Sequence, residues 1–429
     1  WPGGPGQSLV PQDPDTELTS MLNEISPNRI NATIAKLVSF GTRSTLSNQT
    51  DPVRGIGAAR DWIAGEMRQY AAASNGRMTV EVPSYVQEPT SNIPNATVIS
   101  NVVATLRGSE ESNRVYVVSG HYDSRVTNVL NFIDDSPGAD DDGSGVAISM
   151  ELARIFATHV PKATIMFAAV AGEEQGLYGS NFMAQTLKDA GMDVQGMLDN
   201  DIVGSPNGDV GTPSAPFDIR MFVQGIPSSE TSAEISTRAS VGGENDSPAR
   251  QLGRFVSEVA QNAVTQMNVH SIWRPDRFLR GGDHLSFLKA GFPAVRFTEP
   301  QENFAHQHQD VRVVDGVQFG DLPEFVDYDY VNGAALWSLA QAPGTPKNVK
   351  LDTSALTNNS TLSWTLDPAA DGGYEILWRM SDEPAWRYVI SVGQVSSATV
   401  LLSKDNVDFG VRAVGNNGFK SPAAYPLAH

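Results

Sequence analysis

Hydrophobic residues recur with a helical period in two stretches near the start of the chain. Apolar side chains stand three or four positions apart over residues 30–38 and again over residues 56–70. A stripe with this spacing lies on one face of an α-helix. Residues 41–43, between the two stretches, read Gly-Thr-Arg and lack it. The pattern therefore predicts two amphipathic helices joined by a polar loop.

Farther along, short apolar runs alternate with helical patterns. The predicted strands are residues 78–82, 98–106, 115–118, 164–170 and 197–202, and the predicted helices are 144–158, 181–190 and 247–267. Strands that alternate with helices form a largely parallel sheet with helices on both faces. We therefore predict an α/β domain over residues 1–340, with a mixed, largely parallel central sheet. Ligands of such sheets gather beyond the carboxyl ends of the strands.

The pattern changes to a period of two after residue 340. Residues 341–346 are rich in Pro and Gly, as is typical of a linker. Short alternating runs follow at residues 361–364, 374–379, 388–391, 398–402 and 409–414. Such runs, separated by Asn, Gly and Asp turns, predict a β-sandwich. The motifs P-x-N-V, L-S-W, Y-E-I-L-W-R and F-G-V-R-A-V resemble a fibronectin type III domain, so we expect a separate module over residues 347–429 that is dispensable for chemistry.

Metal-binding side chains stand where the predicted strands end. His121 and Asp123 follow the strand at 115–118, and positions i and i+2 share one side of an extended chain. A carboxylate at Asp123 can hold the second ring nitrogen of a metal-bound imidazole. Glu173 and Glu174 follow the strand at 164–170 and, being adjacent, point in different directions. One of them can bind metal while the other stays free as a base.

More carboxylates and imidazoles complete the candidate set. The turn P-G-A-D-D-D-G-S-G holds three aspartates, and either Asp199 or Asp201 can face the same site at the end of another strand. Three of the seven histidines, at 159, 270 and 429, are better explained structurally. His284, His306 and His308 remain as candidates.

Two other interpretations compete with a catalytic metal site. A single H-x-D at a strand end is more often a satisfied polar pair, and an isolated Glu-Glu is usually a solvated turn. The acidic turn also fits a calcium loop that would run from Asp140 to Glu151. That loop should follow a helix, but Ser-Pro-Gly precedes it and a predicted helix runs through its later ligand positions.

Composition narrows the classes of partner and compartment. With 49 acidic and 30 basic residues the formal charge is -19, which disfavours nucleic acid or an anionic membrane as a partner. There are no cysteines, so any zinc must be held by His and carboxylate. No run of about 18 apolar residues predicts a membrane span. The start at Trp1 and six N-x-S/T sequons suggest a processed, secreted protein.

The motifs, taken in order, resemble a known family. G-H-Y-D-S, P-G-A-D-D-D-G-S-G, G-E-E-Q-G-L-Y-G-S, D-N-D, G-G-D-H and H-Q-H-Q-D are similar to those of the secreted di-zinc aminopeptidases, relatives of bacterial leucyl aminopeptidases. The resemblance covers roughly residues 16–339 and implies the zinc exopeptidase fold with two co-catalytic Zn²⁺ ions.

The resemblance also implies a role for each matching residue. Glu173 would be the general base. The implied metal ligands are His121, Asp141, Glu174, Asp201 and His306, with Asp141 bridging the two metals. Asp123, Asp283 and Asp310 would support them, and His308, two residues beyond His306, is the alternative ligand. No tyrosine matches the family's oxyanion partner.

The implied activity is hydrolysis of the N-terminal peptide bond of peptides with a free N-terminus. A carboxypeptidase on the same scaffold is an alternative, for which the cluster Arg274, Arg277 and Arg280 could supply an arginine for the substrate carboxylate. A single-zinc glutaminyl cyclase-like transferase is a second alternative. A non-enzymatic, calcium-binding adhesion protein is the third. We expect the C-terminal module to bind an extracellular polymer or protein.

Overall fold

The computed structural model describes residues 4–209, 211–314, 317–319 and 329–428. Its centre is an eight-stranded sheet with the order β10-β9-β11-β8-β6-β7-β5-β2. The strands are β2 (Met78–Glu81), β5 (Val102–Leu106), β6 (Glu111–His121), β7 (Ala163–Val170), β8 (Asp193–Asn200), β9 (Asp218–Val223), β10 (Asn268–Ile272) and β11 (Ala294–Thr298). Four neighbouring pairs are parallel, namely β6–β7, β6–β8, β8–β11 and β9–β10. The predicted mixed, largely parallel sheet is confirmed.

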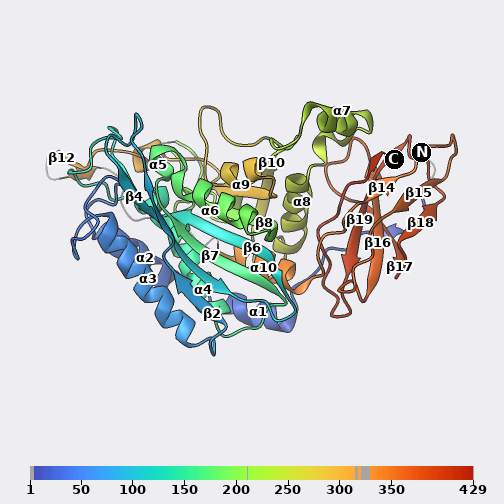
Figure 1. Ribbon diagram of the computed structural model, residues 1–429, viewed down its shortest axis with the longest axis horizontal. Coiled ribbons are helices and arrows are strands. Elements are labelled where there is room, and N and C mark those ends of the chain that lie inside the picture. Colours follow the sequence, from blue (N-terminus) through green and yellow to red (C-terminus); the bar gives the residue numbers. More distant parts are fainter. Residues whose placement is uncertain (1–3, 210, 315–316, 320–328, 429) are drawn as a thin grey trace.

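Helices cover both faces of this sheet (Figure 1). They are α1 (Thr16–Asn23), α2 (Pro27–Val38), α3 (Ile56–Ala72), α4 (Ser144–Phe156), α5 (Glu173–Gly176), α6 (Tyr178–Asp189), α7 (Ser232–Ser240), α8 (Pro248–Ala260), α9 (His284–Ala290) and α10 (Asp329–Gln341). Alternate residues of β6 divide between two hydrophobic clusters. Tyr116 and Val118 pack with α2, α3, α4 and α10, whereas Val115 and Val117 pack with α6 and α9. Burial on both faces explains why β6 reads as a continuous apolar run.

The helix predicted at 247–267 is shorter in the structure, where α8 ends at Ala260. The Asn262 side-chain oxygen accepts hydrogen bonds from the backbone N–H groups of Val264 and Thr265, at 2.9 and 3.1 Å. This local turn competes with a helical continuation. The periodic pattern alone did not reveal the stop.

Two four-stranded sheets form the predicted C-terminal β-sandwich, with orders β1-β17-β16-β19 and β18-β15-β14-β20. The strands are β1 (Gln7–Ser8), β14 (Lys350–Leu351), β15 (Ser360–Ser363), β16 (Gly373–Met380), β17 (Tyr388–Gly393), β18 (Ser397–Val400), β19 (Val407–Val414) and β20 (Leu427–Ala428). Trp364 and Trp378 lie in its core, as expected. The N-terminal strand β1 pairs with β17, so the chain reaches this sandwich from both ends. The boundaries at 340 and 347 and the fibronectin resemblance stay predictions.

Buried ion pairs join the sandwich to the α/β unit. Asp246, which is fully buried, pairs with Arg254 of α8 at 2.8 Å and with Arg379 of β16 at 2.7 Å. Arg412 of β19 bridges to Glu258 of α8 at 3.0 Å. These ion pairs tie the sandwich to the α/β unit, and the expectation that the module is dispensable for chemistry stays a prediction.

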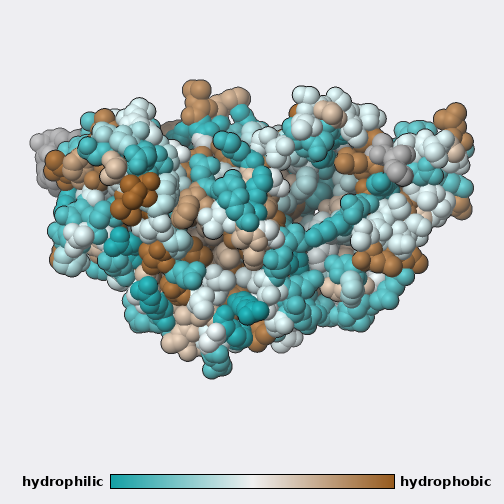
Figure 2. All heavy atoms as spheres, in the orientation of Figure 1, coloured by the Kyte–Doolittle hydropathy of each residue, from teal (hydrophilic) through white to brown (hydrophobic). Residues whose placement is uncertain are grey.

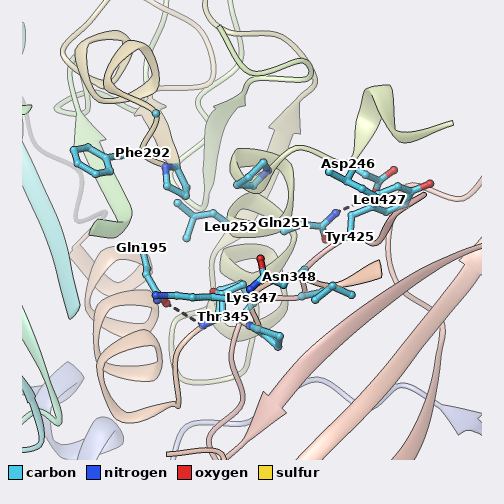
Figure 3. A pocket seen from close by; sticks show the side chains of 18 of the residues that line it. Gln195, Asp246, Gln251, Leu252, Phe292, Thr345, Lys347, Asn348, Tyr425 and Leu427 are labelled. Carbon is cyan, nitrogen blue, oxygen red and sulfur yellow. Dashed lines mark hydrogen bonds between the residues drawn. The ribbon is translucent and has the colours of Figure 1, made fainter. Parts of the chain in front are cut away.

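A cavity of about 590 Å³ lies along this seam (Figure 3). Gln195, Gln251, Thr345 and Tyr425 are among its lining residues, and Gln195 accepts a hydrogen bond from the Thr345 backbone at 2.9 Å. The cavity adjoins Asp193, at the amino end of β8. It therefore lies at the opposite edge of the sheet from the carboxyl ends of the strands.

The face shown in Figure 2 is mostly hydrophilic, with apolar patches scattered between polar regions. No helix in the described ranges combines the length and apolar character needed to cross a membrane. The smaller elements are β3 (Ser84–Gln87), β4 (Thr97–Ser100), β12 (Arg312–Val314), β13 (Val317–Phe319), and the short turns η1 (Ala139–Gly143), η2 (Gly243–Asn245) and η3 (Phe304–His306).

Candidate metal centre

Two groups of potential metal ligands meet at the carboxyl ends of the central strands. His121, Asp141 and Asp201 form the first group, and Asp141, Glu174 and His308 form the second. Within each group one donor atom per residue lies within 4.8 Å of the others. Parallel strands β6, β7 and β8 deliver one member each, directly or through the turn that follows the strand. This edge of the sheet is where the strand pattern predicted a site.

Asp141 belongs to both groups because its two oxygens face in different directions. Its Oδ1 lies 3.1 Å from His121 Nε2, and its Oδ2 lies 2.9 Å from His308 Nε2. His308 Nε2 is also 3.0 Å from Glu174 Oε2, and His121 Nε2 is 3.8 Å from Asp201 Oδ1. One carboxylate therefore connects two sets of donors, as the resemblance implied for Asp141.

The structure places His308, rather than His306, in the second group. His306 ends the short turn η3, and its Nε2 lies 3.2 Å from the side-chain nitrogen of Asn303. Thr127 donates a hydrogen bond to the His308 carbonyl oxygen at 3.0 Å and helps to fix that position. The structure therefore favours His308, the alternative ligand, over the expected His306, and which of the two binds metal stays a prediction. Asp310, expected as a partner of His306, is exposed.

Asp123 lies beside His121 at this edge of the site, with its backbone carbonyl oxygen, rather than the expected carboxylate, nearer to the imidazole ring. His121 Nδ1 lies 3.1 Å from the Asp123 carbonyl oxygen and 3.5 Å from its carboxylate. The carboxylate also accepts hydrogen bonds from the backbone N–H groups of Glu173 and Glu174, at 3.3 and 3.2 Å, and from the Thr45 hydroxyl at 2.9 Å. One buried carboxylate thus orients a histidine and the start of α5 together.

The acidic turn is held in place by two buried side chains. Arg43 donates hydrogen bonds to the carbonyl oxygens of Tyr122, Pro137 and Gly138, at 2.7, 2.5 and 2.6 Å. Asp142 accepts from the backbone N–H of His121 at 2.9 Å. These contacts fix Asp141 beside β6. The sequence pattern does not indicate this role for Arg43, which shows only as part of a polar Gly-Thr-Arg loop between two helices.

The calcium-loop interpretation does not fit this geometry. Glu151, its last ligand, lies on α4 and is bonded to Arg154 at 2.7 Å and to Arg29 at 3.3 Å. A carboxylate held by two arginines is already compensated. The acidic turn instead contributes Asp141 to the two groups of potential metal ligands.

Glu173 stands apart from both groups. It begins α5, and burial raises the pKa of its carboxyl well above the usual range. The charge of His121 opposes this rise, while the neighbouring carboxylates of Asp201, Glu174 and Asp283 add to it. A carboxyl group with a raised pKa, beside the ligands but outside their groups, suits proton transfer.

Comparison with known proteins agrees with this geometry. The model of the family described as Peptidase family M28 matches residues 101–313. A "Probable zinc metalloprotease" of Pyrenophora teres f. teres is 59% identical over 437 residues, covering 100% of this chain and 90% of the relative. This chain belongs to peptidase family M28. Another protein of that name, from Pyricularia oryzae, is 58% identical over 435 residues, covering 98% of this chain and 86% of its own.

Solved structures share the fold of this M28 peptidase. The LapA aminopeptidase of Legionella pneumophila superposes with a TM-score of 0.52 at 18% identity, covering 78% of this chain and 76% of that chain. LapB from the same organism gives 0.50 at 18% identity, covering 77% and 76%. At this level of identity the likeness concerns the fold.

The donor set of the M28 peptidase fits divalent metal. Buried donor atoms in both groups have no hydrogen-bond partner among the described residues, namely His121 Nε2, Glu174 Oε1 and Asp201 Oδ1. Buried polar groups are normally satisfied, so converging unsatisfied donors indicate a bound ion. Imidazole and carboxylate without thiolate suit zinc in a catalytic site.

Two arginines whose role the sequence pattern did not indicate lie close to Asp201 and Glu174, the carboxylates that belong to one donor group each. Arg296, fully buried on β11, lies 2.9 Å from Asp201 Oδ2 and 3.0 Å from Asp276 Oδ2. Arg125 lies 3.3 Å from Glu174 Oε2. The position of Arg296 within an apolar strand could have indicated this contact from the sequence, because a buried guanidinium needs a carboxylate partner.

Three further residues that the sequence pattern indicated have partners in the structure or a shifted pKa. Asp283 precedes α9 and is buried, and burial, with the charge of Asp199, raises its pKa well above the usual range. Of the arginines considered for a carboxypeptidase, Arg277 is paired with Glu302 at 2.8 Å, and Arg280 donates to Gln307 at 3.1 Å.

Proposed function

We propose that this M28 peptidase is a zinc-dependent aminopeptidase that uses two metal ions. The observation that carries the proposal is the position of Asp141, whose two oxygens each meet a histidine of a different group. The relatives named as probable zinc metalloproteases support zinc as the metal. The sequence motifs support cleavage of the N-terminal peptide bond of peptides with a free N-terminus.

The first group would hold one zinc ion and the second group the other, with Asp141 shared. Zinc bound there would acidify a coordinated water and polarise the substrate carbonyl. His121 is prepared for this role, because its Nδ1 faces the Asp123 carbonyl oxygen and its Nε2 is left for metal. Arg296 holds Asp201 by one oxygen and leaves the other facing His121.

Glu173 carries the proton in the proposed reaction. It accepts a proton from the attacking water as the water oxygen bonds to the peptide carbonyl carbon. It then gives that proton to the amine nitrogen as the carbon–nitrogen bond breaks, which restores its carboxylate. Its burial and its place outside both donor groups support this assignment.

The test combines metal content with a pair of substrates. Purified protein should contain two equivalents of zinc and should hydrolyse Leu-Gly-Gly but not its N-acetylated form. One equivalent or none under zinc-replete conditions would overturn the two-metal proposal. Faster cleavage of the acetylated peptide from its carboxyl end would replace the aminopeptidase by a carboxypeptidase.

We also propose that the protein is secreted, on the basis of its six N-x-S/T sequons, and its lack of cysteine is compatible with this. Expression in a fungal host should place it in the medium with N-linked glycans at some of these sites. Retention inside the cells without glycans would contradict this.

A further inference from the structure

Arg125 lies against the second donor group at two points. Its Nη2 donates a hydrogen bond to His308 Nδ1 at 3.0 Å, and its Nε lies 3.3 Å from Glu174 Oε2. Its side chain is 24% exposed, whereas that of Glu174 is 4% exposed. Arg125 is therefore a cation at the open side of the centre, in contact with two potential metal ligands.

The contact with His308 differs in kind from the one that supports His121. A metal-bound histidine normally donates its other ring N–H to a carboxylate or carbonyl oxygen. His121 meets this rule, because its Nδ1 faces the Asp123 carbonyl oxygen at 3.1 Å. A guanidinium has donors only, so His308 Nδ1 must accept from Arg125 and a neutral ring carries its proton on Nε2. That nitrogen is the one that faces the carboxylates of the second group.

The contact with Glu174 also differs from its counterpart in the first group. Arg296 binds Asp201 Oδ2, while Oδ1 is the oxygen that approaches His121. Arg125 instead approaches Glu174 Oε2, the same oxygen that meets His308. Arg296 thus binds the Asp201 oxygen that does not face His121. Arg125 instead approaches the Glu174 oxygen that faces His308, so it would compete with a metal ion for that oxygen.

We propose that Arg125 gates the second donor group, so that this group binds zinc more weakly than the first and fills only when the guanidinium withdraws. This inference rests on the proposed two-metal function. A single side chain, Arg125, would thus make the zinc affinities of the two donor groups unequal. Withdrawal would leave His308 Nδ1 free to carry the ring proton, and Nε2 free for metal.

The experiment is a zinc titration of the metal-depleted, full-length protein against a chromophoric chelator, which resolves the two binding steps without any assay of activity. The variants are Arg125→Gln, which removes the cation, and Arg125→Lys, which keeps it. The matched control is Arg280→Gln, because Arg280 bonds to Gln307 in the loop that carries His308. Circular dichroism of each metal-depleted variant checks that it is folded.

The wild type should show one tight step and one weaker step. Arg125→Gln should tighten the weaker step by about tenfold or more, because it removes a positive charge that repels a cation bound beside it, and should leave the tight step unchanged. Arg125→Lys and Arg280→Gln should stay close to the wild type.

Two results would overturn the gate while leaving the two-metal function intact. They are two equal steps in the wild type, and a weaker second step in Arg125→Gln, which would make Arg125 a support for the ligands. A single equivalent of zinc in every variant would overturn the two-metal function itself, and the gate with it.

Discussion

Arg379→Met tests whether the sandwich and the α/β unit unfold together. The substitution removes a side chain that is 3% exposed and that pairs with Asp246 at 2.7 Å and with Asp408 at 2.9 Å. Loss of one partner from a buried ion pair costs about 3–5 kcal/mol. Asp246 keeps Arg254 at 2.8 Å and Gln251 at 2.9 Å, so we expect the lower end, about 3 kcal/mol.

The size of the thermal shift follows from the size of the unfolding unit. Unfolding entropy is about 2.1 cal/mol/K per residue near 60 °C, or roughly 0.9 kcal/mol/K for a chain of 429 residues. A loss of about 3 kcal/mol should then lower Tm by about 3 °C if the whole chain unfolds in one transition. A sandwich that unfolded alone would show an early transition with a much larger shift.

The assay is unfolding in urea and by scanning calorimetry, with Arg387→Met as the control. Arg387 also lies on the sandwich, but its side chain is 62% exposed and its pair with Glu383, at 3.1 Å, is worth about 0–1 kcal/mol. Equal effects of the two substitutions would refute the conclusion that the buried pairs of the seam stabilise the fold. The same would follow if a truncation near Gln341 kept the stability and zinc content of the full chain.

Three further predictions concern the site and its surroundings. Glu173→Gln should lower kcat by about 10²–10⁴-fold while elemental analysis finds zinc unchanged; loss of zinc would make Glu173 a ligand. His308→Ala should lose zinc from the second group and His306→Ala should keep it, and the reverse result in the same analysis would restore the sequence-based assignment. Burial and the charge of Asp140 raise the pKa of Glu299 to about 10, so the contribution of Glu299 to the free energy of unfolding should fall as pH rises above about 4.5. Glu299→Gln should flatten this slope between about pH 5 and 9 in urea unfolding of the metal-depleted protein, and an unchanged slope would contradict the raised pKa.

The local pattern of the chain was enough to predict the α/β sheet and the strand ends that bear the site. Period-two and period-3.6 repeats depend on near neighbours, and parallel strands place their carboxyl ends at one edge of the sheet. Residues near Asp141 and Glu174 could therefore be grouped from the order of strands and motifs along the chain. The same local information predicted the sandwich.

Only the tertiary structure places His308, and not His306, beside Asp141 and Glu174, because the path of an irregular loop depends on contacts such as that of Thr127 with the His308 carbonyl oxygen. It also decided the roles of Arg125 and Arg296, since an arginine shows no partner until distant segments pack against it. The seam around Asp246 has the same origin, as its partners lie on α8 and β16. The periodicity of a sequence predicts which face of a helix or strand is buried, whereas only the packed structure shows which residues that face contacts.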